Sequence, residues 1–123
     1  MSTSPSIVIA ADRSLRIGSR QDVSDALAAS FGSDGLVLTE QDVSPDFFRL
    51  ATGLAGELFQ KFANYRIPVA LVIRDFASHG ERFTELAHEH AHHPAIRFVH
   101  SMADALGWLS TRPANRPQPN HHL

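Results

Sequence analysis

The feature that most constrains the fold is a run of five apolar residues at positions 69–73, VALVI. Three of the five are β-branched and the run directly follows a proline, which is typical of a buried strand. Two similar short runs, LVLT at 36–39 and IRFV at 96–99, are bounded by turn residues, and helix-length segments separate all three. Strands that alternate with helices predict parallel pairing through right-handed crossovers. We therefore expect an α/β fold.

The amino-terminal part of the chain adds two strands to this expectation. SIVIAA at 6–11 and LRIGS at 15–19 flank a short turn and predict a hairpin. The predicted sheet is then mixed and five-stranded, with the hairpin at one edge, and carries about four helices. Because 123 residues, 43% of them hydrophobic, can bury one sizeable core, we expect residues 1–111 to form a single layered α/β domain. The segment 112–123 has three prolines and no core residues, so it is predicted to be a mobile tail.

Serines mark all four predicted helix starts. Ser19 begins a helix that reaches Phe31, with Phe31 on its apolar face. Ser78 begins the third helix, and Ser101 begins a short fourth helix at 102–110.

The second helix is predicted to begin at the Ser-Pro pair 44–45 and to run without a break to residue 64 or 65. Its segment TGLAGE has two glycines on the polar face, and each costs about 1 kcal/mol relative to alanine inside a helix. Two explanations are open. Either another backbone or a partner approaches closely there, or the helix restarts near Thr52 and lets free amide groups face an anion.

Parallel sheets usually bind ligands outside the carboxyl ends of their strands. His100 and Ser101 follow the last predicted strand. Turn formation and helix capping are the alternative roles for residues at such positions. The candidate ligand crevice comprises Glu40, Asp42, Tyr65, Arg66, Arg74 and Asp75.

The segment LAHEHAHHP at 86–94 contains H-E-x-x-H, the zinc-protease signature, with His88 and His92 as the potential ligands. A catalytic zinc also needs a third protein ligand and a cleft that holds substrate against the metal. Here Pro94 ends the helix two residues later, and the apolar stripe of the helix leaves both histidines toward solvent. We interpret the match as fortuitous and expect at most weak surface chelation at these two histidines.

Composition excludes several classes of function. The net charge is −2, and Lys61 is the only lysine among eleven cationic residues, so nucleic acid is not an expected partner. The chain has no cysteines and no P-loop or G-x-G-x-x-G, so no cofactor and no catalytic residue is assigned. No cationic segment precedes the first apolar run and no eighteen apolar residues run together, so we expect a cytoplasmic protein that does not bind membranes.

The segments SPDFFRLATGLAGELFQKFANYRIPVALV and IRFVHSMADAL, with Asp75-Phe76 between them, resemble a small bacterial family of unknown function, catalogued as domain of unknown function 4180. The resemblance covers residues 35–106. More remotely, the element order and the T-G-L-A-G segment resemble STAS-type domains, the fold of anti-sigma-factor antagonists. That resemblance implies a hydroxyl residue that a partner kinase phosphorylates near a helix start, which changes partner docking. Thr52 matches this position best, with Ser44 as a second possibility.

Two hypotheses of different classes result. The leading one is a non-enzymatic, STAS-like regulatory module that binds a partner protein. The alternative is a small-molecule-binding domain or weak enzyme that uses the strand-end crevice. A homodimer is also reasonable for a chain this short. The candidate interaction face comprises Ser44, Thr52, Gly53, Gly56, Glu57, Gln60 and Asn64.

Overall fold

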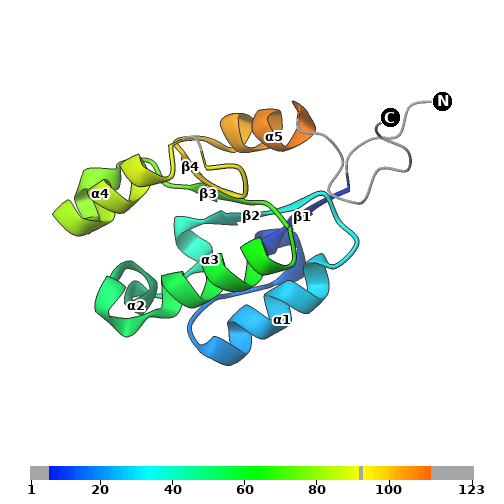
Figure 1. Ribbon diagram of the computed structural model, residues 1–123, viewed down its shortest axis with the longest axis horizontal. Helices are drawn as coiled ribbons and strands as arrows, with labels where there is room; N and C mark the ends of the chain where they lie inside the picture. Colours follow the sequence, from blue (N-terminus) through cyan, green and yellow to red (C-terminus); the bar gives the residue numbers. More distant parts are fainter. Residues whose placement is uncertain (1–5, 92, 112–123) are drawn as a thin grey trace.

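A computed structural model describes residues 6–91 and 93–111. Four strands form one parallel sheet in the order β1-β2-β3-β4 (Figure 1). The α/β fold predicted from the apolar runs is therefore confirmed. The strands are β1 (Ile7–Ile9), β2 (Gly35–Thr39), β3 (Val69–Val72) and β4 (Ile96–Val99).

Five α-helices connect or follow these strands in the described part of the chain: α1 (Arg20–Ser30), α2 (Pro45–Phe48), α3 (Leu54–Asn64), α4 (Glu81–Glu89) and α5 (Met102–Thr111). The strand order follows the chain order, so right-handed crossovers place the connecting helices on one face of the sheet. Figure 1 shows α1 and α3 on that face and α5 on the other. Four short 3-10 helices complete the fold, at Ala10–Arg13, Glu40–Asp42, Leu50–Thr52 and Phe76–His79.

The two faces of the sheet bury cores of unequal size. Leu36 and Leu38 of β2 point into the larger core, with residues of α1, α3 and α4. Val37, between them, points to the other face, where Ala105 and Leu109 of α5 cover it. This alternation is the ordinary consequence of strand geometry.

The predicted hairpin is wrong. After β1 the chain turns into the 3-10 helix Ala10–Arg13, and Ser14 follows it in the left-handed conformation. Ile17, in the second predicted strand, does not pair with β1: its N–H donates to the carbonyl of Asp42 (2.8 Å), and the N–H of Ser44 donates to the carbonyl of Ile17 (2.9 Å). The described sheet is therefore four-stranded and parallel instead of five-stranded and mixed.

The predicted second helix is interrupted. Instead of one helix, the chain forms α2, a 3-10 turn and α3, and the break is at Gly53, whose φ is +77°. The helix therefore restarts near Thr52, as one of the two explanations for the glycines predicts, and the facing of free amide groups toward an anion there stays a prediction.

The ends of two further helices also differ from prediction. Phe31 follows α1 and is 55% exposed, because the chain leaves the helix there with ψ 134°. Gly80, not Ser78, precedes α4, and the Ser78 hydroxyl donates to the carbonyl of Asp75 (2.7 Å). Ser19 and Ser101 do cap α1 and α5, through N–H donors of Asp22 and Asp104.

No helix in residues 6–91 and 93–111 has the length and apolar character needed to cross a bilayer. The segment 112–123, predicted to be a mobile tail, lies outside the described residues.

Candidate functional site

A hollow of about 190 Å³ lies between the amino-terminal ends of α1 and α3. Both helices begin on the side where the strands end, so the hollow belongs to the carboxyl edge of the sheet, where parallel sheets usually bind ligands. Its lining residues are Gly18, Ser19, Arg20, Asp46, Thr52 and Leu54.

Thr52 lies on the rim of this hollow, one residue before the αL glycine that precedes α3. Its side chain is exposed, but its hydroxyl is bonded: it donates to the carbonyl oxygens of Asp46 (2.9 Å) and Arg49 (2.8 Å), which share its proton. It also accepts from the N–H of Leu54 (3.3 Å). The hydroxyl therefore ties the α2 segment to the first turn of α3.

Arg20 is the cation of the hollow. Its guanidinium donates to Glu57 on the first turn of α3 (3.2 Å) and lies against Gly53, 3.4 Å from where a Cβ would stand. Lys61 approaches the other oxygen of Glu57 (3.5 Å). Ser44 lies beside Gly18, and its hydroxyl oxygen is buried with no hydrogen bond to a described residue.

The other predicted face residues extend along α3. Gly56, Gln60 and Asn64 are exposed, and a Cβ on Gly56 would meet nothing within 4 Å. Within the described residues no other segment packs closely against Gly56, so packing inside the chain does not explain this glycine, and the approach of a partner there stays a prediction. The structure brings Thr52, Gly53 and Glu57 together with Arg20, which the sequence did not single out.

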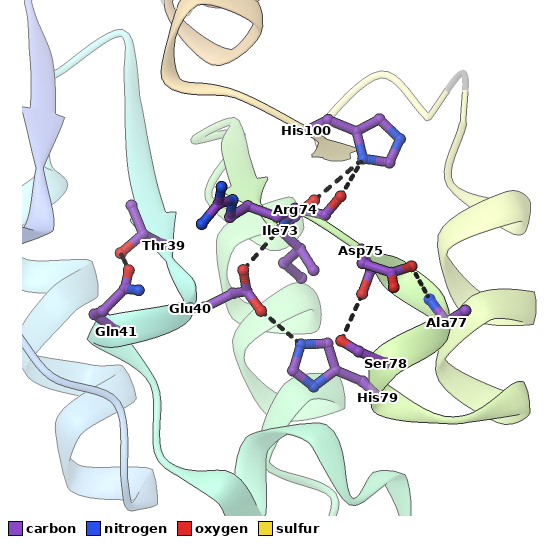
Figure 2. Close-up of polar contacts among 10 residues, drawn as sticks. All are labelled: Thr39, Glu40, Gln41, Ile73, Arg74, Asp75, Ala77, Ser78, His79 and His100. Carbon is purple, nitrogen blue, oxygen red and sulfur yellow. Dashed lines mark hydrogen bonds and ion pairs between the residues drawn. The ribbon is translucent and has the colours of Figure 1, made fainter.

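A second cluster lies farther along the carboxyl edge, where β2 and β3 end (Figure 2). Glu40 accepts from the backbone N–H of Arg74 (3.0 Å) through one oxygen and from Nε2 of His79 (2.8 Å) through the other. The His79 ring stacks on the Phe48 ring, with 3.7 Å between the ring centroids, and packs against the Phe83 ring in a T-shaped arrangement. One carboxylate thus joins the end of β2 to the segments after β3.

The pKa of Glu40 reflects these contacts. Burial raises the pKa, but the hydrogen bond from the Arg74 N–H, the hydrogen bond and charge of His79 and the charge of Arg74 outweigh it, so the pKa lies below its ordinary value. Because the carboxylate accepts from His79 Nε2, the neutral His79 ring keeps its lone pair on Nδ1.

Two further residues of this cluster follow β3 and β4. Asp75 is a turn former, since its carboxylate accepts from the N–H of Ala77 (3.1 Å). His100 is exposed, and its Nδ1 donates to the carbonyls of Ile73 and Arg74, both at 3.2 Å (Figure 2). The Arg74 guanidinium is exposed and makes no hydrogen bond to a described residue.

Three predicted crevice residues do not join this cluster. Asp42 is buried and caps its own turn by accepting from the N–H and hydroxyl of Thr39, both at 2.9 Å. Tyr65 and Arg66 precede β3, so they lie at the opposite, amino edge of the sheet, where Tyr65 meets the Phe31 ring at 5.3 Å. Conversely, His79 joins the cluster although it was not predicted, and it follows the end of β3 closely enough for the strand-end rule to include it.

The H-E-x-x-H segment does not form one helix face. α4 ends at Glu89, His88 is exposed, and His92 lies outside the described residues. Nδ1 of His90 donates to the carbonyl of Leu86 (2.9 Å). Within the described part of the chain, no group of three or more His, Cys, Asp or Glu side chains is placed to hold a metal ion.

Comparison with known proteins gives one result. Searches of curated proteins and of solved structures return no match to the chain. A family model does match, over residues 2–109, and its description is a domain of unknown function, DUF4180. The match spans most of the 123 residues, so the chain belongs to the DUF4180 family.

Proposed function

We propose that the protein is a regulatory module, related in its working to STAS domains, that binds a partner protein over the hollow between α1 and α3. The observation that carries the proposal is the position of Thr52. The residue that the STAS resemblance marks as phospho-acceptor is exposed on the rim of the hollow, immediately before the start of an eleven-residue helix.

The contacts of Thr52 support a switch at this position. The backbone carbonyls of Asp46 and Arg49 now accept the hydroxyl proton of Thr52. A phosphate on Thr52 would replace this proton, so it would release the α2 segment from α3. Its negative charge would also compete with Glu57 for Arg20, whose guanidinium already lies against the neighbouring glycine. Phosphorylation would therefore change both the shape and the charge of the hollow.

The exposed surface of α3 supports docking beside the hollow. Gly56 leaves the helix surface open, and the exposed Gln60 and Asn64 follow it along the helix. Glycine inside a helix costs about 1 kcal/mol relative to alanine, and nothing in the described chain uses the space it leaves. A partner backbone that approaches there would offset that cost.

The test is affinity capture from a lysate of the source organism, with mass spectrometry of both bait and prey. The variant is Gly56→Glu, which the open space at Gly56 tolerates without unfolding. Its matched control is Ala103→Glu, an exposed position on α5 across the sheet. We expect a stoichiometric partner with wild type and Ala103→Glu but not with Gly56→Glu, and a phosphate on Thr52 in a fraction of the bait. Equal capture by all three baits, or an unmodified bait that returns alone, would contradict the proposal.

A second candidate function is a site for a small anionic ligand at the carboxyl edge. The Glu40–His79 pair favours it, because the pair is half-buried, oriented by a backbone N–H and stacked on Phe48, beside an Arg74 guanidinium that bonds to no described residue. The test is an NMR titration of the histidine rings with simple carboxylates and inorganic phosphate. Saturable shifts of His79 that disappear in Arg74→Gln would support the site. Identical shifts in both proteins would exclude it.

A further inference from the structure

The turn between α4 and β4 is held by a histidine that accepts hydrogen bonds. Nδ1 of His93 accepts from two backbone N–H groups, those of Ala95 and Ile96, both at 3.0 Å. Ile96 is buried and is the first residue of β4, the edge strand of the sheet. A ring nitrogen accepts only while it carries no proton, so this geometry requires the neutral ring with its proton on Nε2.

A second histidine packs against the first. The His90 ring stacks on the His93 ring, with 5.0 Å between the ring centroids. It also contacts Phe59 of α3 and Phe98 of β4. Its Nδ1 donates to the carbonyl of Leu86, which closes the end of α4. Two imidazoles at this separation repel each other when both are charged.

The charged or titratable groups that contact His93 among the described residues are His90 and Arg97, whose Nε donates to the His93 carbonyl (3.3 Å). Both oppose a positive charge on the ring. Burial and the charge of His90 accordingly lower the pKa of His93 below its ordinary value.

The segment before the other end of α4 is held by a histidine in a different way, because this histidine donates its hydrogen bond. His79 precedes α4, and its Nε2 donates to Glu40 (2.8 Å). A second proton on His79 would leave this bond in place and add a charge pair to it. Between the two ends, Phe83 and Ala87 are the residues of α4 that the core buries.

We propose that His93 is a pH-sensitive latch on the start of β4. Proton uptake by His93 breaks its two backbone bonds and frees Ala95 and Ile96, while Glu40 and His79 hold the segment that precedes α4. The latch is closed at neutral pH. Since His93 takes up its proton more readily when the turn is open, opening becomes easier as the pH falls below the ordinary histidine value. Because a single proton is taken up, the equilibrium constant for opening can change by at most about tenfold per pH unit. The latch is independent of the proposed partner docking at α3.

The experiment is hydrogen–deuterium exchange of the Ala95 and Ile96 amides, with each rate corrected for its intrinsic pH dependence. The test variant is His93→Asn, whose amide oxygen can replace the Nδ1 acceptor but does not titrate. The control is His88→Asn, which removes an exposed histidine ring of α4 that makes no hydrogen bond to a described residue. Between about pH 7.5 and pH 5.5 we expect protection at both amides to fall by up to about tenfold in wild type and His88→Asn, and to stay constant in His93→Asn.

A second measurement covers the case in which His93→Asn does not fold. Nitrogen NMR shifts of wild-type His93 report its tautomer and titration directly. The latch requires the Nε2–H tautomer and a titration of His93 below the ordinary histidine value. Pure Nδ1–H tautomer, titration at the ordinary value, or protection at Ala95 and Ile96 that does not change with pH would each overturn the proposal.

Discussion

Glu40 is the residue whose ionisation most clearly stabilises the fold. Its folded pKa lies below the ordinary value, so its contribution to stability is complete above about pH 4.5 and is lost as the pH falls through the folded pKa. We expect Glu40→Gln to lower the free energy of unfolding by about 1–2 kcal/mol near neutral pH, because it removes charge-assisted bonds to Arg74 and His79. The difference should shrink between about pH 5 and pH 3. Urea denaturation across this range measures it.

The matched control for this prediction is Glu85→Gln. Glu85 is exposed on α4, and its carboxylate makes no hydrogen bond to a described residue. Its substitution should change stability by less than about 0.5 kcal/mol at every pH. If both variants lost the same free energy of unfolding near neutral pH, the prediction that the Glu40 contacts stabilise the fold would be wrong.

Two phenylalanines differ sharply in burial, although Phe31 was predicted to lie on the apolar face of its helix. Phe47 is 0% exposed and meets Phe59 in the main core, whereas Phe31 is 55% exposed. We expect Phe47→Ala to cost about 3–5 kcal/mol because it leaves a cavity. Phe31→Ala should cost less than about 1 kcal/mol. Thermal and urea unfolding of the two variants compare them directly, and equal losses would refute the different burial.

At the scale of elements, the two glycines of TGLAGE play opposite roles. Gly53 has φ +77° before α3, whereas Gly56 is an exposed residue inside the helix. We expect Gly53→Ala to destabilise the protein by about 1–2 kcal/mol, because alanine is strained in the left-handed region. Gly56→Ala should stabilise it by up to about 1 kcal/mol, because nothing opposes the added Cβ. Changes of the same sign in urea unfolding would contradict the break at Gly53.

Elements whose signal is local were predictable from the sequence. The apolar runs at 36–39, 69–73 and 96–99 became strands, because a buried parallel strand needs apolar residues on both faces. Ser19 and Ser101 became helix caps, because a cap depends on a hydroxyl and an N–H only three residues apart.

Elements that depend on distant contacts were not predictable in the same way. The segment at 15–19 has the composition of a strand, but its pairing of Ile17 with Val43 is set by tertiary packing. The candidate site shows the same limit. The strand-end rule found Glu40 and Arg74, but Glu40 acquires its partner His79 only when the sheet brings positions 39 residues apart together.

At the scale of the whole molecule, the sequential strand order decides where function can reside. Every connecting helix begins where a strand ends, so the hollow at Thr52 and the Glu40–His79 cluster share the carboxyl edge. The exposed Phe31–Tyr65 pair lies at the amino edge. A partner at the hollow and a ligand at the cluster would therefore bind to the same side of the molecule.

The same topology leaves α5 alone on the second face in the described chain, over a small core. α5 lies close against Gly35 of β2, since a Cβ there would stand 2.6 Å from Leu109. We expect Gly35→Ala to push α5 away from the sheet at a cost of about 1–3 kcal/mol while the larger core stays folded. Trp108, the only tryptophan, lies on α5 and reports the movement.

We expect two probes of unfolding, which agree in wild type, to report different transitions in Gly35→Ala. In wild type, tryptophan fluorescence and far-UV circular dichroism should follow one urea transition, as a cooperative domain requires. In Gly35→Ala the fluorescence change should come at lower urea than the circular dichroism change, because α5 detaches before the larger core unfolds. Gly107→Ala is the control: Gly107 is an exposed α5 residue whose added Cβ meets nothing, so both probes should move together to higher urea. Coincident transitions in Gly35→Ala would mean that the two faces unfold as one unit despite their unequal cores.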